Sequence, residues 1–256
     1  MRLIAVDIGN TNVHIGAART GCPDWASTFR VPSDRNRTAD EWQPLLYHHL
    51  AADPAGLDDT RVICCSVVPS LTRSFEEYSR RYLGASVLMV SPALELGITV
   101  STDQPLETGS DRVVNAAAAF AGYGGPVVVV DMGTATKIDA ITADGRFIGG
   151  AIAPGLGLAM DALAQRAAQL YAVPLALPER AIGSNTVEAV QAGVVLGQLK
   201  LIESLVKQAD QELGGARAVV LTGGHANAIA GHTPVITTVR PNLTIDGLRL
   251  LAEMNP

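Results

Sequence analysis

Short apolar runs separated by polar turns occupy most of the chain, and one arrangement of them occurs twice. Residues 2–7 form an apolar run that ends at Asp7, and residues 127–131 form a similar run that ends at Asp131. A glycine-containing turn follows each aspartate. Apolar runs of this length bounded by turn residues predict buried strands. The two aspartates are 124 positions apart (131 − 7), close to half of the 256 residues, which predicts two similar half-molecules.

The remaining pattern predicts helices beside these strands in both halves. In the first half we expect strands at 2–7, 13–18, 61–65 and 86–90 and helices at 39–50, 69–81 and 110–121. In the second half we expect strands at 127–131, 136–142, 146–152 and 219–221 and helices at 157–169 and 187–213. This mixture indicates an α/β protein with a mixed sheet and flanking helices in each half. The glycine-rich segment after residue 121 favours two domains, 1–122 and 123–256.

Composition and charge narrow the classes of function. Hydrophobic residues make up 48% of the chain and charged residues 17%, as is usual for a folded α/β protein. The formal net charge of −6 would repel a polyanion, and the chain has no basic run, so we expect no nucleic-acid partner. Its apolar segments are shorter than the roughly 20 residues that span a bilayer, so we expect no membrane partner.

The cysteines bear on the compartment. Cys22, Cys64 and Cys65 give an odd count, which provides no disulfide framework, and we therefore expect a cytoplasmic protein. Cys64 and Cys65 end an apolar run, where small buried hydrophobic residues are more common than catalytic thiols.

The repeated turns are candidates for binding phosphate. A carboxylate at the end of a buried strand is a hard oxygen ligand for Mg²⁺, and the backbone N–H groups and hydroxyls of the following turn can hold phosphate oxygens. Glycine and asparagine are also ordinary residues of a hairpin turn, so one copy alone would carry little weight. Two copies half a chain apart favour a clamp for nucleotide phosphates.

A third segment, residues 105–112, joins a turn to a helix. Asp111 and Arg112 lie in the first turn of the helix expected at 110–121. An acidic residue there can simply complement the helix dipole. Neighbouring residues on a helix point in different directions, so these two are poorly placed to pair with each other. The alternative is that both serve a single ligand.

Taken together, these motifs resemble those of the type III pantothenate kinases. The shared segments are D-x-G-N-T at 7–11, P-x-x-x-G-S-D-R at 105–112, D-x-G-T-A-T at 131–136, the glycine-rich run at 149–155 and T-G-G at 222–224. The resemblance covers about residues 5 to 250. It implies a duplicated RNase H-like fold of the actin/hexokinase/Hsp70 type, with ATP in the cleft between the halves. The implied reaction is phosphorylation of the primary hydroxyl of pantothenate, the first step toward coenzyme A, by a homodimer.

The resemblance also implies a role for individual residues. The first loop, which would bind ATP, comprises Asp7, Ile8, Gly9, Asn10, Thr11, Asn12, Val13 and His14. Asp7 would lie near the magnesium ion, Thr134 would contact ATP, and Asp131 would bind a monovalent cation, K⁺ or NH₄⁺. The residues that would bind pantothenate are Gly109, Ser110, Asp111, Arg112 and Thr186. Asp111 would accept the proton, and Thr186 would reach the substrate of the partner subunit.

Two positions depart from the family pattern. Ser110 replaces the usual alanine, which adds a hydroxyl and is expected to change little. Lys137 replaces a threonine of the second loop. Its ammonium group could take the place of the monovalent ion beside Asp131, contact a phosphate, or simply reach solvent. It could also mark a member with reduced turnover.

Two other functions fit the same residues. One is phosphorylation of another sugar or small acid by a kinase of this superfamily. The other is a non-catalytic regulatory protein that keeps the fold and binds a ligand. The presence of all three aspartates, Asp7, Asp111 and Asp131, favours an enzyme.

Overall fold

The computed structural model describes residues 1–19, 21–22, 24–50, 59–167 and 170–256, which form two compact units. Unit 1 contains Met1–Leu96, Gln104–Ala118 and Thr244–Pro256, and unit 2 contains Gly97–Asp103 and Ala119–Leu243. The change of unit after Ala118 falls inside helix α3 (Ser110–Tyr123), near whose end the sequence places the domain boundary. Each unit also takes a segment from the other half of the sequence. The limits 1–122 and 123–256 therefore stay a prediction.

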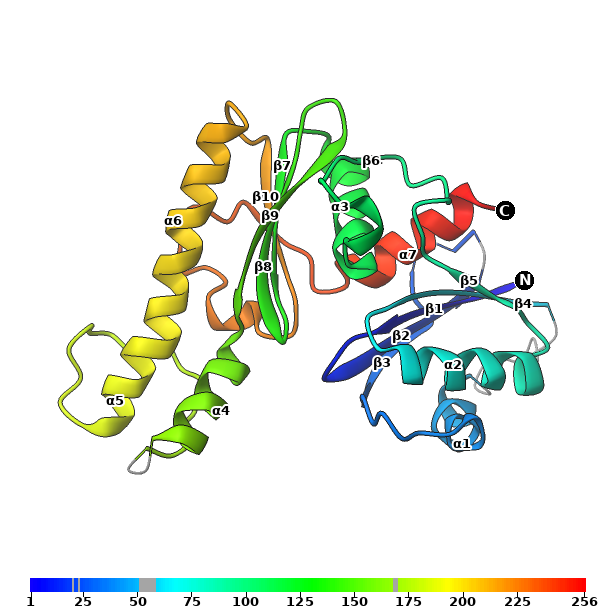
Figure 1. The fold of residues 1–256 in the computed structure, drawn as a ribbon, viewed down its shortest axis with the longest axis horizontal. Helices are drawn as coiled ribbons and strands as arrows, with labels where there is room; N and C mark the ends of the chain where they lie inside the picture. Colours follow the sequence, from blue (N-terminus) through cyan, green and yellow to red (C-terminus); the bar gives the residue numbers. More distant parts are fainter. Residues whose placement is uncertain (20, 23, 51–58, 168–169) are drawn as a thin grey trace. The chain divides into compact units, whose positions relative to one another are not determined.

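Unit 1 is built on a five-stranded sheet with the order β3-β2-β1-β4-β5 (Figure 1). Its strands are β1 (Arg2–Ile8), β2 (Asn12–Arg19), β3 (Ser27–Pro32), β4 (Thr60–Ser66) and β5 (Val87–Met89). The first three form an antiparallel meander, whereas β4 runs parallel to β1 and β5 runs parallel to β4. Strand β1 is central, and most of its side chains are buried.

Helices α1 (Ala39–Leu50) and α2 (Pro69–Tyr78) pack on one face of this sheet, and α2 continues into a π-helical turn, η1 (Ser79–Leu83). Successive residues of a strand point to opposite faces, so every second residue of β1 enters this core. The aromatic rings of Trp42 and Phe75 meet edge to face there, with centroids 5.4 Å apart. Burial of this apolar surface is the main source of stability of the layer.

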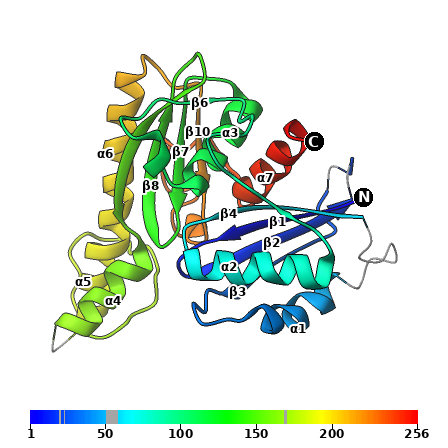
Figure 2. The same ribbon diagram turned by 45° about the vertical axis from the view of Figure 1, so that its right-hand side comes forward.

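The other face of the unit 1 sheet carries the beginning of α3 and the last helix, α7 (Leu243–Met254). Figure 2 shows α7 on the opposite side of the sheet from α2. Helices α3 and α7 approach closely because Gly247 has no side chain: a Cβ there would lie 2.7 Å from Val114. Gly16 of β2 similarly admits the ring of Trp25, which a Cβ would meet at 2.7 Å.

Unit 2 repeats this topology with one added strand. Its sheet has the order β11-β10-β7-β8-β9-β6. The strands are β6 (Thr99–Val100), β7 (Val127–Met132), β8 (Ala135–Ile141), β9 (Arg146–Pro154), β10 (Ala218–Thr222) and β11 (Thr238–Val239). Without β6, the order and the strand directions match those of unit 1, with β7 in the place of β1. The predicted duplication is confirmed.

The helices of unit 2 are α4 (Leu156–Arg166), α5 (Thr186–Gln191) and α6 (Gly197–Glu212), with a π-helical turn η3 (Ala192–Leu196) between the last two. One apolar stripe of this continuous segment packs into the core of the unit; its members include Val195, Leu199, Ile202 and Val206. By length and composition alone, the segment 186–212 could cross a membrane. A core helix of a folded unit passes the same test, and 44% of its apolar window is buried here.

Most predicted elements are present, with small differences at their ends. The helix expected at 69–81 ends as α2 at Tyr78, and that expected at 157–169 ends as α4 at Arg166, with 168–169 outside the described residues. The sequence analysis missed β3, β6, β11 and α7. It also missed two single 3₁₀ turns, η2 (Pro105–Glu107) and η4 (Ala226–Ala228).

Candidate functional site

The first aspartate belongs to a row of four side chains that crosses the unit 1 sheet. Asp7 pairs in register with Cys65 of β4 and with His14 of β2, and His14 pairs with Arg30 of β3. Paired residues on neighbouring strands point to the same face. The Cys65 thiol donates a hydrogen bond to Asp7 Oδ1 at 3.4 Å. The row lies at the carboxyl ends of β1 and β4, the edge at which open α/β sheets bind ligands.

His14 is held in its neutral form. Its side chain is buried, and Arg30 Nη2 donates to His14 Nδ1 at 3.3 Å. Burial and the positive charge of Arg30 lower the pKa of His14 from 6.5 to about 4, against a smaller opposing effect of Asp246. Since a guanidinium group can only donate, the imidazole hydrogen resides on Nε2. Near neutral pH this position therefore adds no positive charge beside Asp7.

The turn between β1 and β2 forms the predicted phosphate loop. Gly9 N donates to the Asn12 carbonyl at 3.1 Å and closes the hairpin. Ser33 supports it, since its hydroxyl donates to the Gly9 carbonyl at 2.6 Å. Of the loop residues, the exposed ones are Asn10, Thr11 and Asn12, and the fully buried ones are Ile8 and Val13. The side chains of the buried pair belong to the core, so these two could serve a ligand only through their backbone.

The start of α3 places the second carboxylate of unit 1. Asp111 Oδ1 accepts a hydrogen bond from Arg112 N at 2.9 Å. The carboxylate folds back over Gly109, where a Cβ would lie 2.7 Å from Oδ1. Burial raises the pKa of Cys65, and the negative charges of Asp7 and Asp111 add to this effect. Cys65 contacts Asp7 directly, and the next residue, Ser66, is bonded to Ser110, which directly precedes Asp111.

Ser110 joins the start of α3 to the unit 1 sheet. Its hydroxyl accepts from Ser66 N at 3.1 Å and donates to the Ser66 carbonyl at 3.2 Å. Ser66 is the last residue of β4, and its own hydroxyl accepts from Thr72 Oγ1 at 2.6 Å. The hydroxyl that distinguishes this chain from the family pattern is thus used inside the protein, where it links the start of α3 to the end of β4.

The second aspartate stands in an equivalent row in unit 2. Asp131 pairs in register with Thr222 of β10 and with Lys137 of β8. Lys137 Nζ donates to Asp131 Oδ2 at 2.8 Å, and the two side chains are only 14% and 13% exposed. The lysine head therefore forms a largely buried ion pair instead of reaching solvent.

Glycines surround the other oxygen of this carboxylate. Gly223, at the end of β10, has φ +98°, and a Cβ there would lie 2.6 Å from Asp131 Oδ1. The turn after Asp131 is covered in the same way, because a Cβ on Gly155 would lie 2.5 Å from the Thr134 carbonyl. Close packing around the second turn thus explains the glycines at positions 155 and 223. Thr134 itself is exposed.

The two hairpin turns differ in length. Four residues separate the last paired residues, Ile8 and Val13, in unit 1, whereas three separate Met132 and Thr136 in unit 2. The counterpart of Lys137 is therefore His14. One aspartate faces a cation across the hairpin, and the other faces a buried neutral ring.

Thr186 lies in unit 2, at the first position of α5. The side chain of Asn185 caps this helix and accepts from Glu188 N at 3.0 Å. Thr186 is exposed.

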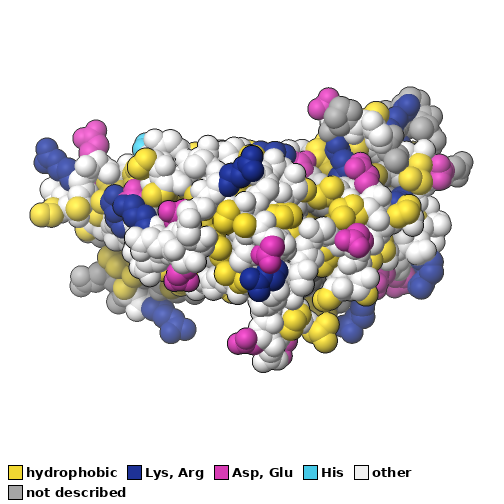
Figure 3. All heavy atoms as spheres, turned by 90° about the horizontal axis from the view of Figure 1, so that it is seen from above, with side chains coloured by type: hydrophobic (Ala, Val, Ile, Leu, Met, Phe, Trp, Pro, Cys, Tyr) yellow, Lys and Arg dark blue, Asp and Glu magenta, His cyan; other side chains and the backbone are white. Residues whose placement is uncertain are grey.

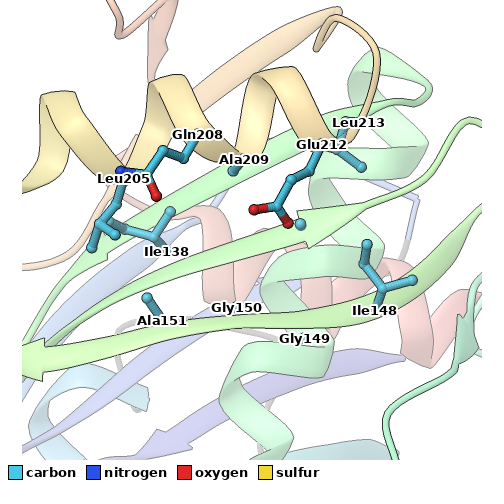
Figure 4. A pocket seen from close by; sticks show the side chains of 11 residues that line it. Ile138, Ile148, Gly149, Gly150, Ala151, Leu205, Gln208, Ala209, Glu212 and Leu213 are labelled. Atoms are coloured by element: carbon cyan, nitrogen blue, oxygen red, sulfur yellow. The ribbon is translucent and has the colours of Figure 1, made fainter.

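A pocket of about 300 Å³ also lies in unit 2, between β8, β9 and α6 (Figure 4). Figure 4 shows Gln208 and Glu212 reaching toward it from α6, above apolar residues of the two strands. None of the predicted site residues in the described part of the chain lines it. Acidic and basic side chains are interspersed on the face shown in Figure 3. The candidate chemistry therefore belongs to the two aspartate rows.

The donor sets of the rows differ in the cations that they fit. Among the described residues, no group of three or more His, Cys, Asp or Glu side chains could hold a metal ion. Mg²⁺ is commonly held by one or two carboxylates together with substrate phosphates and waters, which Asp7 at the start of the turn fits. At Asp131, the ammonium group of Lys137 already pairs with Oδ2, which does not fit a further cation at that oxygen.

Known proteins match this chain over most of its length. The family model for type III pantothenate kinase matches residues 3–208. The chain belongs to the type III pantothenate kinase family. A type III pantothenate kinase of Roseiflexus castenholzii is 46% identical over 256 residues, which cover 99% of each chain. The chain also matches solved structures whose sequences are much less similar to it.

Those matches show the fold. The structure of MreB 5 of Spiroplasma citri bound to AMPPNP has a TM-score of 0.55 at 12% identity, with 98% of this chain and 96% of that chain covered. An inorganic polyphosphate/ATP-glucomannokinase from Arthrobacter has a TM-score of 0.51 at 17% identity, with 97% of each chain covered. The predicted duplicated actin-like ATPase fold is confirmed.

Proposed function

We propose that this chain phosphorylates the primary hydroxyl of pantothenate with ATP, the first step toward coenzyme A. Its family membership supports this reaction. The observation that carries the residue assignment is the arrangement of Asp7 and Asp111 in unit 1: Cys65 donates to Asp7, and the next residue, Ser66, is bonded to Ser110, which directly precedes Asp111. Asp7 lies near the end of β1 beside a turn, and Asp111 lies in the first turn of α3.

Asp111 is assigned as the proton acceptor. Phosphoryl transfer passes through a loose transition state, so the protein contributes mainly positioning and charge stabilisation. The hydrogen bond from Arg112 N fixes the orientation of the Asp111 carboxylate. That carboxylate would orient the substrate hydroxyl and accept its proton as the new bond forms. Gly109, Ser110 and Arg112 are assigned to pantothenate with it.

The first loop is assigned to the nucleotide. Asp7 to His14 would contact ATP, with Thr134 as a further contact. Magnesium, when bound, supplies positive charge that stabilises the phosphoryl oxygens. Asp7 would hold it, and neutral His14 would not compete with it for the carboxylate.

Lys137 is assigned the place of the monovalent cation. The support is its 2.8 Å bond to Asp131 Oδ2 and the low exposure of both groups. A lysine ammonium is a compact charge on a flexible stem, which suits it to occupy the volume of a monovalent ion. Activity measured with sodium as the sole monovalent cation tests this assignment, and a strict requirement for K⁺ or NH₄⁺ would refute it.

We further propose a cytoplasmic homodimer in which Thr186 contacts the substrate of the partner subunit. The proposed contact is supported by the exposure of Thr186 at the start of a capped helix, where backbone N–H groups favour anions. Light scattering combined with gel filtration measures the subunit number.

A coupled ADP-release assay tests the reaction itself. Pantothenate should stimulate ADP release from ATP, and a panel of sugars and small acids should not. Stimulation by another acceptor would favour a different kinase of the superfamily. Binding of pantothenate by calorimetry without any turnover would favour the regulatory alternative.

A further inference from the structure

Two consecutive cysteines near the end of β4 have different surroundings. Cys64 belongs to the core between the sheet and helices α1 and α2, and its thiol donates to the neighbouring Cys65 carbonyl at 3.4 Å. Cys65 points to the other face, because side chains alternate along a strand. There it pairs in register with Asp7 and donates to Asp7 Oδ1. Both thiols are fully buried.

We propose that Cys65 is a positioning residue whose thiol fixes the Asp7 carboxylate in the orientation that holds the magnesium–nucleotide complex. This inference rests on the proposed role of Asp7. The torsion that turns an aspartate carboxylate is broad, so an unsupported group would sample many orientations. A buried donor on the adjacent strand restricts it to a narrower range.

The thiol suits this position because it donates without adding charge. In unit 2, Lys137 neutralises Asp131 across the hairpin. In unit 1, the residues in register with Asp7 are Cys65 and neutral His14, so Asp7 is supported without a cation at either register position.

The position also couples the two carboxylates of unit 1. Ser66, the residue after Cys65, is bonded on both its N–H and its carbonyl to the Ser110 hydroxyl, and Ser110 precedes Asp111. The end of β4 thus supports Asp7 through one residue and the start of α3 through the next. Cys65 contacts Asp7 directly, whereas its link to Asp111 runs through Ser66 and Ser110. A substitution of Cys65 should therefore weaken the binding of magnesium and nucleotide first.

The test compares Cys65 with Cys64, which is equally buried but faces away from Asp7. Cys65→Ala and Cys65→Val remove the donor, Cys65→Ser keeps one, and Cys64→Ala is the matched control. Affinity for a non-hydrolysable ATP analogue is measured by calorimetry over a range of magnesium concentrations. Thermal unfolding of each variant, without ligand, reports folding separately.

We expect Cys65→Ala and Cys65→Val to raise the magnesium concentration for half-maximal nucleotide binding by about 10-fold, the lower end of the effect of losing a residue that orients a metal ligand. Cys65→Ser should stay within about threefold of the parent protein, because its hydroxyl restores a donor. Cys64→Ala should lower the unfolding temperature, as cavity formation does, and leave the magnesium dependence unchanged.

Three outcomes would overturn the inference. One is parent-like magnesium dependence in a folded Cys65→Val or Cys65→Ala. The second is an equal weakening in Cys64→Ala and the third is no recovery in Cys65→Ser, either of which would indicate a packing effect alone. Failure of the proposed function looks different: the parent protein would bind the nucleotide analogue with magnesium but transfer no phosphate to pantothenate.

Discussion

The Lys137–Asp131 pair yields a prediction whose size can be worked from its geometry. At 2.8 Å and an effective dielectric constant of 20, the gross attraction between the two charges is about 6 kcal/mol. Desolvation of both groups offsets most of it. Removal of one partner from a buried pair nevertheless costs about 3–5 kcal/mol, because the other charge stays buried without compensation. Asp131 is 13% exposed, which places the expected loss near the lower limit.

We therefore expect Lys137→Met to lower the free energy of unfolding by about 3 kcal/mol in buffer that contains only a bulky organic cation. For a chain of this size, that corresponds to a fall of roughly 6–12 °C in the unfolding temperature. If the ammonium group takes the place of the monovalent ion, addition of KCl should recover part of the lost stability of Lys137→Met. KCl should leave the stability of the parent protein unchanged.

The double variant Asp131→Asn/Lys137→Met provides the control. It removes both charges, so it should be more stable than Lys137→Met alone. Differential scanning calorimetry of the parent protein and the two variants, each with and without KCl, measures these differences. The reasoning would be refuted if the free energy of unfolding of Lys137→Met lay within about 1 kcal/mol of that of the parent protein. It would also be refuted if the double variant were no more stable than Lys137→Met.

Three further predictions concern the reaction and its environment. Asp111→Asn should lower kcat by roughly 10²–10⁴ in the ADP-release assay, and unchanged turnover would remove Asp111 from the role of proton acceptor. Because the pKa of folded His14, about 4, lies below the ordinary 6.5, the unfolded chain binds the proton first as the pH falls. Stability should therefore decline by about 2 kcal/mol between pH 7 and pH 5, as measured by urea unfolding, and His14→Gln should lack this part of the slope. In a homodimer with shared sites, a mixture of inactive Asp111→Asn and inactive Thr186→Ala chains should recover up to about a quarter of the parent activity after subunit exchange. No recovery would show that Thr186 acts within its own subunit.

The sequence predicted the repeated part of the fold because both copies carry the same local signals. Each copy has an apolar strand, an aspartate and a glycine turn, and these determine the central hairpins of both sheets. Strand β3 escaped notice because only alternate residues are partly buried and its sequence includes exposed Thr28 and Arg30. The assignment of α7 to unit 1 depends on tertiary packing at Gly247, which no local pattern encodes.

The site was predictable where chemistry follows from residue type. Asp7, Asp111 and Asp131 were singled out by their positions after strands or at a helix start, although their assigned roles stay predictions. The contribution of Cys65 was not recognised, because a thiol after an apolar run resembles ordinary core. One signal was available: adjacent Cys64 and Cys65 on a strand must face opposite sides, so one of them had to share the face of Asp7.

The one-residue difference between the two hairpin turns has a consequence for the surroundings of the two carboxylates. A length change within a strand would send every later side chain to the opposite face, whereas a change in the turn leaves both strands paired as before. A turn of either length is therefore compatible with an intact sheet. The difference gives the two carboxylates unequal surroundings while His14 and Lys137 keep equivalent positions across the hairpins.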